Sequence, residues 1–161
     1  LIMGTVTAFL FRHYEPLIQQ ASIFAIFITL ITGTAGNTGT QSLAVAIRKI
    51  GLHEEEQSFW KVLVQEGTTG LGIGLISGAV VFGIVSLWQG NIVLGGIIGF
   101  AMLASIFVAA LTGTCIPFAL EKFDFDPSIA SGPFITTVND LTTVFVYFTI
   151  VSQFISVYLV K

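Results

Sequence analysis

The chain has 161 residues, of which 54% are hydrophobic and only 9% are charged, and its net charge is -3. A soluble domain typically carries about 25% charged residues, so this composition excludes a soluble globular protein and indicates an integral membrane protein. The six Lys and Arg residues form no basic run, which argues against nucleic-acid binding. The single cysteine, Cys115, excludes an intrachain disulfide or a cysteine metal cluster.

The apolar segments predict an all-α, polytopic membrane helix bundle. A membrane-spanning helix needs about 20 mainly apolar residues, and four segments are long enough: 16–50, 61–88, 92–120 and 134–160. Residues 1–11 are too short to span alone, and we expect them to be the remaining half of a truncated helix. The chain 1–161 is therefore predicted to be one transmembrane domain of five helices, the first of them cut.

Basic residues predict the orientation of these helices. Four of them fall on one side of the predicted spans: Arg48, Lys49, Lys61 and Lys122. Only Arg12 and Lys161 fall on the other side. The positive-inside rule therefore places the first group in the cytoplasm. Trp60 and Trp88 bracket the second span, as interfacial anchors do.

Glycines recur at four-residue spacing in the second and third spans. Gly70, Gly74 and Gly78 form one series, and Gly95 and Gly99 repeat the spacing. Small residues spaced in this way let helix backbones approach closely in lipid. We expect tight packing within one bundle, and the alternative is a seam between two subunits.

A polar stretch, GTAGNTGTQS, interrupts the first span at residues 33–42. Thr34, Asn37 and Gln41 are three or four residues apart and share one helix face. The three glycines of the stretch are expected to weaken the helix locally and to expose backbone carbonyls. Irregular backbone at membrane depth is tolerated only where protein or water covers it. We therefore expect the stretch to line the inner part of a cation path.

Asp140 is the only charged residue between Phe134 and Val160. An Asp at the centre of a membrane helix costs about 2.5 to 3.5 kcal/mol, and no Lys or Arg lies at comparable depth. The polar residues three or four positions away form a stripe with it: Thr136, Asn139 and Thr143. We interpret this stripe as facing water and binding cations. The alternative is a protonated Asp140 bonded to the threonines.

Two further acidic regions have simpler interpretations. Glu66 follows Trp60 by six residues and is placed near the cytoplasmic interface, where it either snorkels or lines an inner vestibule. Asp124 and Asp126 lack the other ligands of a calcium loop, and we expect their segment to be a helix start ahead of the last span.

The ligands at depth are all oxygens, which favours Mg²⁺, Ca²⁺ or Mn²⁺ over zinc or copper. Mg²⁺ keeps several of its waters and binds through one or two carboxylates. One Asp per chain is too few for an all-protein calcium cage. A homodimer would bring two copies of Asp140 to one axis, and two carboxylates would balance the charge of a hydrated dication.

Two motifs resemble the transmembrane domain of the MgtE magnesium channels: GNTGTQSLAVAIR at 36–48 and PFITTVNDLTTVFVYF at 133–148. The resemblance covers essentially the whole chain. It implies a homodimer whose pore lies on the two-fold axis, in a bacterial inner membrane. It also implies that Asp140 binds hydrated Mg²⁺, that Gly36 and Asn37 lie near the inner mouth, and that Glu66 matches a family glutamate.

The chain departs from the family pattern at Gly132, where some relatives have Asn, and at Thr136, where Ala also occurs. The cytoplasmic N and CBS domains that close these channels at high Mg²⁺ are not within this chain and are expected partners. The predicted metal site comprises Asp140, Asn37, Gly36, Thr136 and Glu66.

Three other functions are alternatives to a channel. An exchanger coupled to Na⁺ or H⁺ would need a second titrating group, for which only Glu66 is available. A membrane enzyme would need a second carboxylate, or a base beside a nucleophile, at depth. The sequence supplies neither, so we expect no enzyme activity. A purely structural dimer module would leave Asp140 without a purpose.

Overall fold

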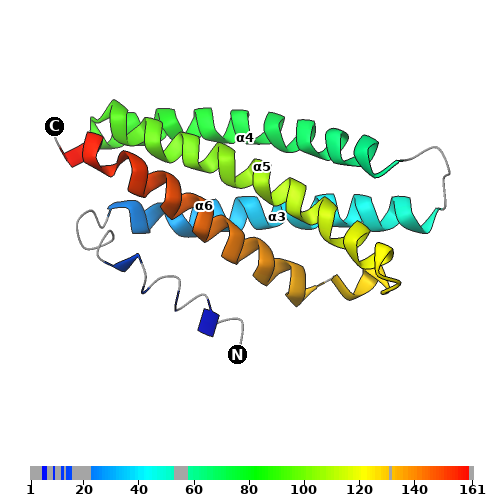
Figure 1. Ribbon diagram of the computed structural model, residues 1–161. Helices are drawn as coiled ribbons and strands as arrows, with labels where there is room; N and C mark the ends of the chain where they lie inside the picture. The colour runs from blue at the N-terminus through cyan, green and yellow to red at the C-terminus, as the bar shows by residue number, and fades with distance from the viewer. Residues whose placement is uncertain are drawn as a thin grey trace.

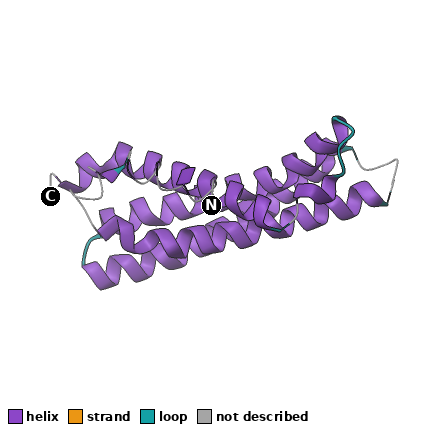
Figure 2. Cartoon of the chain, turned by 90° about the horizontal axis from the view of Figure 1, so that it is seen from below, coloured by secondary structure: helices purple, strands orange, loops and turns teal. Residues whose placement is uncertain are grey.

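The computed structural model is a bundle of four long helices (Figure 1). It describes residues 5, 6, 9, 12, 14, 15, 23–52, 58–130 and 132–159. The helices are α3 (Ile23–Gly51), α4 (Phe59–Gln89), α5 (Ile92–Lys122) and α6 (Pro133–Leu159), and a short 3-10 helix, η1 (Pro127–Ala130), precedes α6. Figure 2 shows that the described part of the chain is almost entirely helical, with only short loops and turns.

All four long helices are of a length and composition that can cross a membrane. This finding confirms the four predicted spans and the all-α class. The predicted beginning of the first span at residue 16 and the end of the last at residue 160 lie outside the described residues. The truncated helix expected at residues 1–11 is described only at isolated positions, so the fifth helix stays a prediction.

The turn between α4 and α5 is made by two residues, Gly90 and Asn91. Gly90 adopts a left-handed backbone, with φ of 62°, and ends α4. The Asn91 side-chain oxygen accepts hydrogen bonds from the backbone N–H groups of Val93, at 3.0 Å, and Leu94, at 3.1 Å. These bonds cap the amino end of α5. The tight turn makes α4 and α5 antiparallel neighbours.

The connection from α5 to α6 contains the helix start that was expected ahead of the last span. The carboxylate of Asp126 accepts a 2.8 Å hydrogen bond from the backbone N–H of Ser128 at the beginning of η1, which precedes α6. Hydrogen bonds from the Ser128 side chain and backbone hold the pKa of Asp126 below its ordinary value. The chain then reverses at Gly132, where φ is 68°, before α6.

The spaced glycines bring the backbones of α4 and α5 into direct contact. A Cβ added at Gly74 would lie 2.9 Å from the carbonyl oxygen of Leu103, and one added at Gly78 would lie 2.6 Å from that of Gly99. A Cβ at Gly95 would lie 2.8 Å from the carbonyl oxygen of Phe82. The expectation of tight packing within one bundle is therefore confirmed. These glycines are used inside the protomer rather than at a seam between subunits.

Apolar side chains from all four helices fill the centre of the bundle. The largest fully buried members are Phe24, Ile31, Leu94, Ile98, Ile106, Tyr147 and Phe148. The Tyr147 hydroxyl donates a 2.6 Å hydrogen bond to the carbonyl of Phe24, which ties α6 to the first turn of α3. This bond satisfies a polar group that lipid could not.

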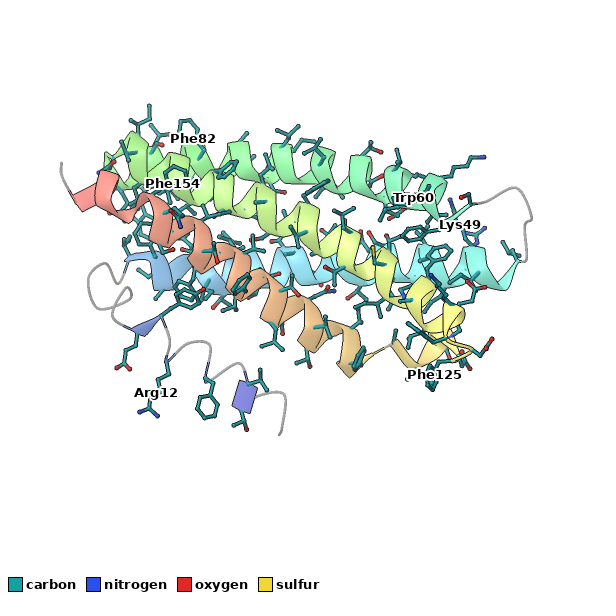
Figure 3. The ribbon with its side chains drawn as sticks, viewed as in Figure 1. Arg12, Lys49, Trp60, Phe82, Phe125 and Phe154 are labelled. Atoms are coloured by element: carbon teal, nitrogen blue, oxygen red, sulfur yellow. The ribbon has the colours of Figure 1, made fainter. Side chains whose placement is uncertain are left out.

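One end of the bundle carries the predicted basic residues. It is formed where α3 ends, α4 begins and α5 ends, and we call it the basic end. The Lys49 ammonium donates a 2.7 Å hydrogen bond to the Gln65 side chain there, and Figure 3 shows Lys49 and Trp60 at this end, with Phe154 at the other. Trp60 and Trp88 are 68% and 65% exposed, as expected of interfacial anchors. Assignment of this end to the cytoplasm stays a prediction.

Replacement of Gly78 by Ala tests the backbone contact between α4 and α5. The new methyl group has no room beside Gly99, so we expect Gly78→Ala to lower the free energy of unfolding by about 1 to 3 kcal/mol, the usual cost of overpacking. Thermal unfolding in detergent measures the change. Gly83→Ala is the control, because nothing lies within 4 Å of its added Cβ. Equal stability of the two variants would contradict the packing described.

A candidate cation site between α3 and α6

The carboxylate of Asp140 lies beside Gly36, on the neighbouring helix. A Cβ added at Gly36 would be 3.6 Å from Oδ1 of Asp140, and apart from the adjoining backbone of α3 no other heavy atom of the described residues comes within 4 Å of that position. Gly36 follows Ile23 by 13 residues and precedes Gly51 by 15. At 1.5 Å per residue, both ends of α3 are therefore about 20 Å away. The carboxylate lies at the middle of the bundle.

Asp140 has no compensating charge within the described part of the protomer. It is half-buried, and no described residue gives its carboxylate a hydrogen bond or an ion pair. The basic residues of the four helices lie at the basic end: Arg48, Lys49, Lys61 and Lys122. The site therefore keeps a negative group at membrane depth available for a ligand.

The polar stretch of α3 is helical throughout, so the predicted local weakening of the helix is wrong. Its threonine hydroxyls donate back to backbone carbonyls one turn earlier, as Thr34 does to Leu30 and Thr38 to Thr34. The carbonyl of Gly36 accepts a 2.8 Å bond from Thr40. The carbonyls of the stretch are therefore already engaged and are not free cation ligands. Tertiary packing has overridden the low helix propensity of glycine.

One face of α3 remains polar and exposed. Asn37 and Gln41 are both exposed, and the half-buried Thr34 lies one turn before Asn37. Neither amide side chain has a hydrogen-bond partner among the described residues. The prediction that these residues share a face is confirmed. Because hydrocarbon cannot satisfy exposed amides, this face needs water or another protein surface against it.

The predicted polar stripe of α6 is divided between two directions. Thr136 is exposed, and its hydroxyl donates a 3.2 Å hydrogen bond to the carbonyl of Gly132. Asn139 and Thr143 are 0% and 1% exposed and face the protomer interior. The interpretation of one water-facing stripe is therefore wrong for these two residues. A helix places neighbouring residues about 100° apart, so Asp140 and Asn139 point to different surroundings.

Three helices meet at Gly39, a contact that the sequence analysis missed. A Cβ at Gly39 would lie 2.7 Å from Cγ of Asn139. On its other side, a Cβ added at Gly113 of α5 would lie 2.9 Å from the carbonyl carbon of Gly39. Gly39 falls three residues after Gly36, and that spacing was the available signal for a packed helix face. Nothing in the sequence indicated that Gly113 would be the opposing surface.

Glu66 lies apart from the pair formed by Asp140 and Gly36. It is 6% exposed, on the face of α4 that also carries Val62, Gly70 and Gly74 and packs on α5. It does not snorkel to the protomer surface. Since α4 packs mainly on α5, whereas Asp140 lies at the junction of α3 and α6, one protomer does not bring the two carboxylates together.

The chemistry of the site follows from these positions. Within the described residues no three His, Cys, Asp or Glu side chains come together, so a protomer offers one carboxylate and neutral amide oxygens rather than a closed metal cage. Such donors suit a hard cation that retains its own waters. The four membrane-length helices define a multi-pass membrane protein, and an acidic group at mid-depth without a basic partner among the described residues is typical of ion pathways in this class.

Comparison with known proteins agrees with this class. Residues 28–150 match the family described as "MgtE: Divalent cation transporter", and the chain belongs to this family. It is 51% identical over 155 residues to "Magnesium transporter MgtE" of Enterococcus faecalis, a match that covers 96% of the chain and 34% of that protein. This finding confirms the resemblance noted from the two motifs.

Two further relatives, also named "Magnesium transporter MgtE", are more distant. The protein of Bacillus subtilis is 35% identical over 158 residues, which cover 96% of the chain and 35% of the relative. That of Thermus thermophilus is 28% identical over 151 residues, which cover 93% of the chain and 33% of the relative. The chain therefore spans about a third of the length of these curated relatives.

Replacement of Gly36 by Ala tests the surroundings of the carboxylate. A methyl group there makes an ordinary contact with Asp140 and meets nothing else within 4 Å. Because Ala also favours helix over Gly by up to about 1 kcal/mol, we expect Gly36→Ala to leave the free energy of unfolding unchanged or slightly higher. Thermal unfolding in detergent is the measurement. A loss above about 2 kcal/mol would mean that another backbone, such as that of a second subunit, packs on Gly36.

Proposed function

We propose that this chain forms, as a homodimer, the pore domain of a Mg²⁺-selective channel in a bacterial inner membrane. The observation that carries the proposal is the carboxylate of Asp140, held at mid-depth beside Gly36 without a basic partner. An uncompensated Asp at the helix centre costs about 2.5 to 3.5 kcal/mol. A transported dication supplies the missing positive charge.

The exposed polar face of α3 supports a pore rather than a dry packing site. Asn37 and Gln41 present amide groups beside the helix that carries Asp140, at a depth where hydrocarbon would leave them unsatisfied. In the proposed arrangement they face water and the hydration shell of the ion. Thr136, one turn from Asp140 toward the basic end, continues this polar lining. Glu66 lies outside the proposed ion-binding centre, because α4 carries it on the side that packs on α5.

A second copy of the chain completes the site. One carboxylate neutralises half the charge of Mg²⁺, and two related by a two-fold axis neutralise all of it. The unpartnered polar face of α3 provides the surface across which the copies face each other. The ion keeps its inner waters, because Mg²⁺ dehydrates reluctantly and is bound through few carboxylates. Selection then rests on the size and charge of the hydrated ion.

Flow is inward when the basic end lies in the cytoplasm. A membrane potential of 100 mV supplies about 2.3 kcal/mol per charge, and so about 4.6 kcal/mol for a dication. No second ion gradient is needed. The N and CBS domains expected in a longer protein would regulate the pore from the cytoplasmic side, in keeping with relatives about three times as long as this chain.

Replacement of Asp140 tests the proposal. We expect Asp140→Asn, which keeps the shape and removes the charge, to reduce the rate of Mg²⁺ uptake by about tenfold or more, the factor that corresponds to about 1.4 kcal/mol of lost ion binding. Asp140→Glu keeps the charge and is expected to retain part of the uptake. The measurement is the fluorescence of a Mg²⁺ indicator inside proteoliposomes held at a set membrane potential.

Asp126→Asn is the matched control, since it removes an exposed carboxylate outside the helices that span the membrane. It should transport at the rate of the unmodified protein. Undiminished uptake by Asp140→Asn would remove the assignment. Uptake that depends on an imposed Na⁺ or pH gradient would replace the channel with an exchanger.

A further inference from the structure

We propose that Asn139 is a positioning residue for the cation site. Its carboxamide is seated in a notch at Gly39, and this contact fixes the rotation of α6 that sets the carboxylate of Asp140 against Gly36. The inference rests on the proposed function, because the position of Asp140 governs ion binding only where Asp140 binds the ion.

The notch is shaped for the Asn139 side chain. The three heavy atoms nearest to a Cβ added at Gly39 all belong to Asn139: Nδ2, Cγ at 2.7 Å and Oδ1 at 2.9 Å. Such distances leave no room for even one methyl group. The absence of a side chain at Gly39 is therefore what lets α6 lie so close to α3 at this level.

The carboxamide is buried without partners. Asn139 is 0% exposed, and neither its Nδ2 nor its Oδ1 has a hydrogen bond within the described structure. Buried polar groups without partners are rare in proteins, and each one calls for an explanation. A leucine would occupy a similar volume without leaving polar atoms unpaired. The unused hydrogen-bonding groups directly precede Asp140 in the chain, which indicates a role tied to the site rather than to packing alone.

The notch is backed by a second close contact between helix backbones. Behind Gly39, its carbonyl carbon would lie 2.9 Å from a Cβ added at Gly113 of α5. α5 is in turn held to α4 by the contact of Gly78 with Gly99. A group seated in the notch is therefore fixed relative to three helices.

Two consecutive residues of α6 thus meet two glycines of α3. Asn139 meets Gly39, and Asp140 meets Gly36 three residues earlier on the same face. Side chains of consecutive helical residues diverge by about 100°, so the pair of contacts fixes both the rotation of α6 and its position along α3. Loss of the first contact frees the carboxylate to move relative to the ion path.

The test compares the half-saturating Mg²⁺ concentration with the maximal rate of uptake. In enzymes, misplacement of a functional group by 1 Å can lower the reaction rate by up to about a hundredfold. We expect Asn139→Ala and Gly39→Ala each to raise the half-saturating Mg²⁺ concentration about tenfold in the intact protein in proteoliposomes. The control is Gly72→Ala, because nothing lies within 4 Å of its added Cβ. That variant should match the unmodified protein.

The double variant Gly39→Ala/Asn139→Ala separates positioning from general damage. The methyl added at residue 39 enters the space that the carboxamide leaves. We therefore expect the double variant to bind Mg²⁺ more tightly than Gly39→Ala alone. If the two substitutions caused unrelated defects, their effects would add and the double variant would bind Mg²⁺ more weakly than either single variant. If Gly39→Ala does not fold, recovery of folded, Mg²⁺-transporting protein in the double variant supports the proposal. Failure of the double variant to recover either property overturns it.

Two outcomes distinguish this inference from the function on which it rests. If Asp140→Asn loses uptake while Asn139→Ala keeps the unmodified half-saturating Mg²⁺ concentration, the positioning role is wrong and the channel site stands. If Asp140→Asn transports normally, the channel site is wrong and the positioning role falls with it.

Discussion

A negative charge at the middle of a membrane-length bundle, with no basic residue of the four described helices at its depth, is the constraint on which the rest of the structure depends. Asp140 is stable there only if its surroundings supply water or positive charge. The exposed amides of Asn37 and Gln41 provide a polar face on one side of the bundle. The opposite side of α6 is packed into the bundle. The carboxylate therefore lies on the border between the packed interior and a polar face, which is where the proposed ion path runs.

Glycines determine where the border between the packed interior and the polar face lies. Direct backbone contacts join α5 to α4 at Gly78 and to α3 at Gly113, so the centre of the bundle is defined by main chain rather than by flexible side chains. Helices in direct main-chain contact can shift little relative to one another, because closely packed protein interiors have low compressibility. α6 docks on the assembly through Asn139 and through the hydroxyl of Tyr147. The helix that carries the charge is thus held against α3 by a close side-chain contact and by one buried hydrogen bond.

The sequence predicted the helices well because their signal is long-range and simple: apolar runs of membrane length, bounded by charged or capping residues. It also predicted Asp140 and Gly36 as site residues, and these two are adjacent in the structure. It failed where the outcome depended on direction around a helix axis. Asn139 was placed with Asp140 because spacing alone cannot tell which neighbour is buried, and α3 was expected to weaken because propensity ignores the packing that holds Gly39 in a helix.

The turn between α4 and α5 has a consequence for how the protein enters the bilayer. Only Gly90 and Asn91 separate the two helices, and both are committed to ending one and beginning the next. Neither helix can be released into lipid and later joined by a distant partner, since the link is too short to let them separate. The two helices therefore enter the bilayer together as a hairpin, whose backbones are already placed to meet at the spaced glycines.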